Sequence, residues 1–369
     1  MVAEFLINMA VCVLLPTMPR WLLSDQNLTA GETGLVMGAF GLGLFALGGL
    51  CSWLVQRYRR NEVCMWASAA LLLDVAALWY LDSLKCEFAG FWPVLLQRFS
   101  LGAAFGLAQM VLTSTLILDT CESDRRTEAN YSASWFSRFA LALGPLAGML
   151  SYSHFGFGGV LLASMGCAAV AIVLIGRVSC PFRAPADDVS VVSLDRFLLP
   201  QALPLAANLM LVSCVLGLLL SLPLGELFYA LMMGGFLLAV IAQRFVFRDA
   251  DLKSEILAGL ILLLAAQLVL LNYPESPAAP LLTGLGSGLV GSRFLLFFIK
   301  LSRHCQRGTS QSTFFLSWES GLALGLAVGY GLFYRQSESL LTLSVSLSVV
   351  GLAVYHVFIH SWFVRNKNR

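Results

Sequence analysis

Charged residues are scarce in this sequence. Asp, Glu, Lys and Arg make up 12% of its 369 residues, whereas a soluble domain carries about 25%. Hydrophobic residues, by contrast, account for 58% of the chain. A folded core cannot absorb that much apolar surface, and the remainder must contact lipid instead of water. The scarcity of charge therefore excludes an ordinary soluble protein and indicates an integral membrane protein.

Features typical of enzymes, metal proteins and nucleic-acid-binding proteins are also missing. The net charge is only +2, which gives no basis for nucleic-acid binding. The sequence has no P-loop or dinucleotide fingerprint, and its nine cysteines include no C-x-x-C pair. Among four histidines, His356 and His360 lie one helical turn apart, but no acidic or cysteine partner is near them in the sequence. We therefore expect no enzyme activity, no metal and no cofactor.

Apolar stretches of about 20 residues, separated by short polar turns, predict twelve transmembrane helices. Such stretches cross a bilayer as helices because lipid offers the backbone no hydrogen-bond partners. The first stretch lacks a basic region and a small-residue cleavage site, so we interpret it as a membrane helix and not as a signal peptide. The expected spans are residues 4–22, 32–55, 62–81, 90–117, 131–152, 157–177, 197–221, 226–247, 254–272, 279–300, 313–334 and 340–363.

The distribution of Lys and Arg predicts which ends of these helices face the cytoplasm. If the N-terminus is cytoplasmic, 17 of the 23 basic residues lie in segments on that side. Because basic residues favour the cytoplasmic side, both termini of this multi-pass protein are predicted to face the cytoplasm from the cell (inner or plasma) membrane. The six exceptions are Lys85 and Arg335 in outer loops, Arg20 near the outer end of the first span, and Arg98, Arg138 and Arg293 inside spans.

Two of the stretches repeat a pattern of small residues. The fifth contains Ala140-Leu-Ala-Leu-Gly144-Pro145-Leu-Ala-Gly148, and the eleventh contains Gly321-Leu-Ala-Leu-Gly325-Leu-Ala-Val-Gly329. Because these spans hold the same place in each half and run the same way, the pattern indicates a parallel repeat. Small residues at every fourth position let a neighbouring helix approach closely.

The longest predicted cytoplasmic connection separates the two halves. It contains Pro181, Pro185 and a pair of aspartates, and it divides the spans six and six. We therefore expect an all-α membrane protein with an N-terminal six-helix bundle over residues 1–177, a linker over 178–196 and a C-terminal six-helix bundle over 197–369. A pseudo-twofold axis would relate the two bundles.

These features together resemble the major facilitator superfamily. Gly144-Pro145-x-x-Gly148 is similar to a signature of its antiporters, including proton-coupled drug exporters, and Arg98-x-x-x-Gly102-x-x-x-Gly106 is similar to its Arg and Gly pattern in the fourth span. The resemblance implies two bundles that rock around a central site, with proton-coupled efflux of a small organic solute. It also implies that the first, fourth, seventh and tenth spans line the pathway, which makes Asn8 and Asn208 candidate lining residues.

The loop after the second span departs from the family pattern. That pattern is Gly-x-x-x-Asp-Arg-x-Gly-Arg, and Arg57 and Arg60 fit it. Ser52, Gln56 and Arg59 replace the first Gly, the Asp and the second Gly. The acidic member of the usual gating charge cluster is therefore missing from this loop.

Among the charged residues of the predicted spans, five stand out: Asp74, Arg98, Arg138, Arg293 and Glu319. A charge near the bilayer centre costs about 3 kcal/mol on insertion scales, so each needs a partner or a watery cavity. Asp74 and Arg98 are expected at similar depth in neighbouring antiparallel spans, and we hypothesise that they pair. The pair would be either a static link between helices or a proton site whose carboxylate alternates between Arg98 and a proton.

Arg138 and Glu319 occupy equivalent places in the repeat. Each lies two residues before a glycine-stripe position, which is about 200° around a helix, so each points away from the stripe. They predict a substrate or coupling site in a central cavity or, alternatively, a latch between the halves. Arg293 would either neutralise Glu319 or extend to the inner headgroups.

The fourth span also carries a polar or small face, which predicts a cavity wall. This face consists of Arg98, Gly102, Gly106, Gln109 and Thr113. We expect Asp74 and Glu319 to couple protons, and the three arginines to tune them or to meet an anionic group of the substrate. The expected partners are a small-molecule substrate, protons and the lipid bilayer, with the chain acting as a monomer. The alternatives are a nutrient or organic-anion importer, a lipid flippase and a receptor that does not transport.

Overall fold

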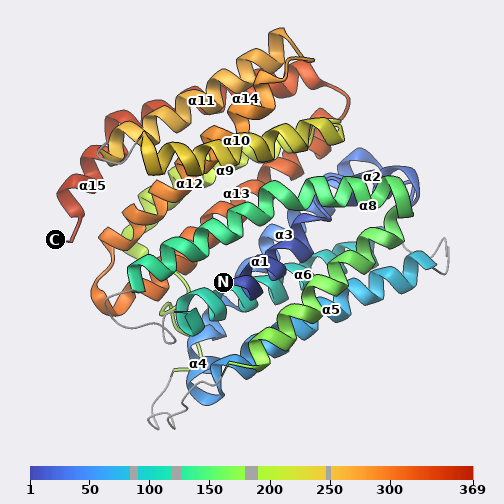
Figure 1. The fold of residues 1–369 in the computed structure, drawn as a ribbon. Helices are drawn as coiled ribbons and strands as arrows, with labels where there is room; N and C mark the ends of the chain where they lie inside the picture. Colours follow the sequence, from blue (N-terminus) through green and yellow to red (C-terminus); the bar gives the residue numbers. More distant parts are fainter. Residues whose placement is uncertain (84–89, 118–125, 179–189, 247–250, 369) are drawn as a thin grey trace.

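The computed structural model describes residues 1–83, 90–117, 126–178, 190–246 and 251–368. Within these ranges the chain is built from helices and short helical turns, with no strand. Figure 1 shows the helices as two bundles, one from the blue to green part of the chain and one from the yellow to red part.

The N-terminal bundle follows the expected spans closely. Its first span is broken into α1 and α2, its second continues from α3 into α4, and its fourth ends in a π-helical turn. The elements are α1 (Val2–Cys12), α2 (Thr17–Ser24), α3 (Ala30–Ala46), α4 (Cys51–Arg57), α5 (Arg60–Ser83), α6 (Phe91–Val111), the turn Leu112–Leu116 and α8 (Arg126–Gly176).

The C-terminal bundle begins after a 3-10 turn at Pro200–Ala202 and ends in a helix interrupted by a π-helical turn. Its elements are α9 (Leu203–Leu220), α10 (Glu226–Phe245), α11 (Leu252–Asn272), α12 (Ala278–Leu301), α13 (Arg307–Phe333), α14 (Ser337–Val354), the π-helical turn Tyr355–Ile359 and α15 (His360–Asn366).

Helix α8 contains two membrane spans. At 1.5 Å per residue its 51 residues would extend about 75 Å, more than twice a bilayer core. Gly156 interrupts it with φ 67° and ψ −170°, a conformation that glycine adopts readily because it has no Cβ. The two arms of α8 meet at this residue and run in different directions (Figure 1).

Twelve spans result when α13 is added. Ten helical segments of the described chain are long and apolar enough to cross a membrane, and the two arms of α8 are counted together among them. Helix α13 begins with a stretch of threonine, serine and glutamine, but it lies at the interior, packed on α9 and α3. The predicted twelve-helix architecture is therefore confirmed.

Glycines explain how the repeated spans pack in each half. A Cβ at Gly144 would collide with Cys12 of α1, and a Cβ at Gly325 would collide with the backbone of Cys214 of α9. The equivalent stripe positions Gly148 and Gly329 face Val13 and Ser221 in the same way. The small residues thus bring α8 against α1 and α13 against α9, which is the same contact made twice by a parallel repeat.

The two bundles meet along two main helix pairs. Helix α3 packs on α13, and the first arm of α8 packs on α10. We name the two ends of the molecule by their composition. The basic end holds α4, the start of α9 and α15, and the far end holds α2 and the turn between α13 and α14 (Figure 1).

Candidate functional site

Arg98 is a buried cation without hydrogen-bond partners for two of its nitrogens. Its side chain projects from α6, is 1% exposed, and has its guanidinium carbon 4.7 Å from the ring centroid of Phe40 on α3. Nε and Nη1 are buried and make no hydrogen bond with any described residue. Because an unpaired buried charge is costly, this guanidinium is suited to receive an anion.

Glu319 of α13 approaches the same region from the other bundle. Both Glu319 and Arg98 lie within electrostatic range of the Cys12 thiol at the end of α1. The Glu319 side chain is partly exposed, and its carboxylate makes no hydrogen bond within the described part of the chain. Opposite charges from the two bundles therefore converge on one residue at their interface.

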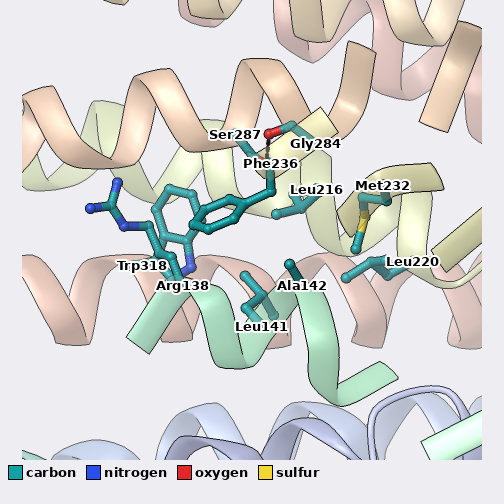
Figure 2. Close-up of a pocket in the computed structure, with 10 residues that line it drawn as sticks. All are labelled: Arg138, Leu141, Ala142, Leu216, Leu220, Met232, Phe236, Gly284, Ser287 and Trp318. Atoms are coloured by element: carbon teal, nitrogen blue, oxygen red, sulfur yellow. Dashed lines mark hydrogen bonds between the residues drawn. The ribbon is translucent and has the colours of Figure 1, made fainter. Parts of the chain in front are cut away.

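A small pocket lies between the two bundles, beside Trp318 of α13. Five helices of both bundles line it, and Figure 2 shows Arg138 at one edge with the Trp318 and Phe236 rings beside the pocket. The Arg138 side chain donates to the Gly288 carbonyl on α12 at 3.3 Å. The volume is about 10 Å³, which suffices for one water molecule. The pocket is thus a nearly closed space between the bundles.

The far end holds a larger cavity between the bundles. Its volume is about 530 Å³, and its walls include Arg20 and Met149 from the N-terminal bundle and Tyr229 and Tyr330 from the C-terminal bundle. Arg20 lies within electrostatic range of both tyrosines. The interface between the bundles is therefore accessible from the far end.

The basic end, by contrast, is closed by contacts between α6 and α13. The rings of Phe105 and Phe315 lie edge to face with centroids 5.6 Å apart. About two turns further toward the basic end, Gly308 packs against the carbonyl of Ser114 so closely that a side chain would not fit. Gln109 lies between these two contacts along α6, fully buried, with neither amide atom hydrogen-bonded to a described residue.

The linker adds a second closure at the basic end. Asp195 accepts hydrogen bonds from Ser52 of α4 at 3.5 Å and from Thr309 of α13 at 3.1 Å. The backbone N–H groups of Arg196 and Leu199 donate to hydroxyls of α13 at 2.8 Å. We call Asp195, Ser52 and Thr309 the linker clasp. It bridges the two bundles with a carboxylate that the loop after the second span lacks.

The loop residues around the clasp have local partners. Gln56 donates to Ser52 at 3.0 Å, and the Arg57 guanidinium lies 5.5 Å from the Trp53 ring centroid. Arg60 begins α5 and makes a polar contact of its own.

The predicted pairing of Asp74 with Arg98 is wrong. Asp74 accepts a hydrogen bond from Ser100 at 2.7 Å, and Gln97 donates to its backbone carbonyl at 3.3 Å. Asp74 contacts α6 close to Arg98 along the helix, but the direction in which each side chain points around α6 decides which residue it bonds. Gln97 and Ser100 share the face of α6 that meets α5, whereas Arg98 is rotated about 100° toward Phe40.

The predicted alternatives for Arg293 are also wrong, because it pairs within its own bundle. Its Nε lies 2.5 Å from a carboxylate oxygen of Glu255 on α11, and the two side chains are 15% and 1% exposed. Sequence reasoning missed Glu255, although its position inside the expected ninth span was a usable signal. The ion pair joins α11 to α12 and leaves Arg293 outside the site near Cys12.

Two predicted lining asparagines make hydrogen bonds within their bundles. Asn208 donates to the Gly351 carbonyl at 3.1 Å and thereby links α9 to α14, while its Oδ1 has no partner among described residues. Asn8 donates to the Glu4 carbonyl of its own helix at 2.8 Å. Glu4 is 1% exposed. Its burial could not be predicted from the sequence, because it lies at the edge of the first span.

Comparisons with known proteins agree with this architecture. The profile of the Major Facilitator Superfamily matches residues 1–326, and no curated protein matches the sequence. The solved structure of the nucleoside transporter NupG has a TM-score of 0.69 at 12% identity, covering 96% of this chain and 97% of that one. The human organic anion transporter MFSD10 (TETRAN) has a TM-score of 0.70 at 15% identity, with 96% and 97% covered.

A third similar structure is a bacterial homologue of the iron transporter ferroportin in an outward-facing state. Its TM-score is 0.66 at 14% identity, covering 98% of both chains. At these identities the structural likeness shows the fold alone.

Proposed function

The chain belongs to the major facilitator superfamily, and on that premise we propose that it exports a small organic solute by alternating access coupled to protons. The two bundles rock around the site between them, exposing it to each side of the membrane in turn. The basic end faces the cytoplasm, as the distribution of Lys and Arg predicts. The cavity at the far end and the closure at the basic end then correspond to an outward-facing conformation.

One observation carries this proposal: Arg98 and Glu319 approach Cys12 from opposite bundles. Rocking of the bundles changes the separation between this cation and this carboxylate. When they are close, the cation stabilises the charged carboxylate, and when they separate, that stabilisation is lost and the carboxylate takes up a proton more readily. Glu319 therefore binds and releases its proton in step with the conformational change.

Arg98 also indicates the chemistry of the solute. Two of its nitrogens have no hydrogen-bond partner among the described residues, so the guanidinium can donate to a carboxylate, sulfonate or phosphate group. An organic anion matches this donor, and one of the similar structures is itself an organic anion transporter.

The direction of efflux rests on the glycine motif of α8. Gly144 packs against Cys12, the residue that Arg98 and Glu319 also approach. A change in the packing of α8 on α1 would therefore move the site directly. The motif's similarity to the antiporter signature favours export, and uptake of an organic anion together with a proton is the second candidate.

Asp74 is the second carboxylate proposed for coupling. Its hydrogen bond to Ser100 lies between α5 and α6, within the N-terminal bundle. A contact inside one bundle keeps its length when the two bundles rock against each other. Asp74 is therefore a weaker candidate than Glu319.

Transport in liposomes tests the proposed function. Purified protein would be reconstituted with an internal pH dye and challenged in turn with organic anions, organic cations and sugars. We expect proton flux that depends on an organic anion and requires protein. Flux driven only by a neutral sugar would contradict the assigned solute class, and flux of solute without protons would contradict the coupling.

A further inference from the structure

A second cavity at the basic end lies entirely within the C-terminal bundle. It has a volume of about 440 Å³ and opens between the start of α11, the end of α12 and the last turns around α15. Among the described residues, three lysines line it, namely Lys253, Lys300 and Lys367, together with one acidic residue, Asp251. The function proposed above does not use this cavity.

The cavity has an ordered aromatic wall. The rings of Phe297 and Phe363 stack with centroids 3.9 Å apart and an interplanar angle of 8°. His360 lies beside them, with its centroid 6.3 Å from that of Phe297. Its Nδ1 is buried and has no hydrogen-bond partner among the described residues.

Local structure places these groups together. The π-helical turn Tyr355–Ile359 immediately precedes His360, and such a turn shifts the register of the residues that follow. The chain end is then tied across α12, because Asn368 donates from its backbone to the Lys300 carbonyl at 2.9 Å and from its side chain to the Leu301 carbonyl at 2.7 Å. These bonds hold Lys367 at the cavity.

The charge of the lining favours an anion. Three ammonium groups face one carboxylate, and His360 lies within electrostatic range of Lys253 and Lys367. Crowded ammonium groups repel one another, and a group with several acceptor oxygens relieves that repulsion with charge-assisted hydrogen bonds. Basic pockets between membrane helices on the cytoplasmic side are suited to phosphate-bearing lipid headgroups.

We infer that this cavity binds the phosphate group of an anionic phospholipid in the adjacent leaflet. Exposed apolar side chains favour a lipid over a soluble phosphate. Val364 lines the cavity and is 48% exposed, and the preceding residues Val357 and Phe358 are 74% and 53% exposed. A headgroup in the cavity would leave its acyl chains against this apolar surface.

Native mass spectrometry of the detergent-purified full chain tests the site. The protein would be titrated separately with phosphatidylglycerol, phosphatidylcholine and inorganic phosphate. The double variant Lys253→Gln/Lys300→Gln removes two ammonium groups, whereas Arg365→Gln removes a neighbouring exposed charge that does not line the cavity. We expect phosphatidylglycerol to bind at least about tenfold more weakly to the double variant and unchanged to the control.

A second variant should change the affinity for the lipid in the opposite direction. Asp251→Asn removes the carboxylate from the lining, so phosphatidylglycerol should bind more tightly than to the wild type. If the double variant unfolds, the single variant Lys300→Gln at an exposed position replaces it. Equal binding of phosphatidylglycerol and phosphatidylcholine, or undiminished binding to the lysine variants, would overturn the site. Lysine-dependent binding of inorganic phosphate alone would overturn the lipid assignment.

Discussion

Arg98 of α6 and Glu319 of α13 lie within electrostatic range of the same thiol, that of Cys12, although they belong to opposite bundles. Neither is held by the ion pairs that fix other membrane charges, such as Arg293 with Glu255. Arg98 instead lies over Phe40, with two nitrogens lacking partners among described residues. In the proposed function, these two charges serve the solute and the proton.

Replacing Arg98 should weaken binding of anionic solutes. A hydrogen bond to a charged group contributes about 1.5–3 kcal/mol, so Arg98→Gln should raise the apparent KM at least about tenfold. Solute uptake into proteoliposomes measures this change, and Arg365→Gln on the exposed surface of α15 is the control. An unchanged KM for every transported anion would exclude Arg98 from the solute site.

The glycine motif should not tolerate a larger side chain at Gly144, where α8 contacts α1. A Cβ at Gly144 would meet both the side chain and the backbone of Cys12, whereas a Cβ at Gly166, on the second arm of the same helix, meets nothing within 4 Å. Overpacking costs about 1–3 kcal/mol, so Gly144→Ala should lower the thermal unfolding temperature. Gly166→Ala should leave that temperature unchanged or raise it slightly, because alanine favours helix. Equal effects would show that the close packing of α8 on α1 is not required.

The linker clasp should favour the conformation that is closed at the basic end. Asp195 is half exposed, so its bonds contribute about 1 kcal/mol or less, and Asp195→Asn should shift the conformational equilibrium by about fivefold or less. Hydrogen–deuterium exchange should become faster near Ser114 and Gly308. Asp25→Asn at the far end is the control, and a clasp variant with the exchange pattern of the wild type would contradict this role.

The ion pair of Arg293 with Glu255 should stabilise the fold without serving transport. Glu255→Gln leaves a largely buried guanidinium unpaired and should cost about 3 kcal/mol, measured by chemical unfolding in detergent. The double variant Glu255→Gln/Arg293→Gln should recover part of that loss because no buried charge remains. Transport by the double variant should keep its proton coupling, and loss of coupling in a folded sample would place the pair in the mechanism.

The sequence predicts the helices well, because length and apolarity suffice to define a membrane span. Even α13, which is polar, is recovered from the alternation of basic loops and from its repeat of α8. Side-chain partners are predicted poorly. Asp74 bonds Ser100, two residues beyond the expected Arg98, because helix rotation cannot be inferred from depth.

The partners that were missed lie far away in the sequence. Glu255 is 38 residues from Arg293, and Asp195 is 143 residues from Ser52. Neither contact follows from spacing, since only tertiary packing determines which helices are neighbours. Arg138, by contrast, contacts α12 while its glycine stripe packs on α1, as the repeat predicts, because that direction depends on rotation within one helix.

Proton movement in the Glu319→Gln variant tests the central claim most directly. Proteoliposomes containing a pH dye would be given a transported organic anion, and proton flux and solute flux would be recorded together for wild type, Glu319→Gln and Asp74→Asn. We expect Glu319→Gln to abolish proton flux while solute exchange continues, and Asp74→Asn to keep the two fluxes coupled. Coupled proton and solute flux in a folded Glu319→Gln variant would contradict the central claim.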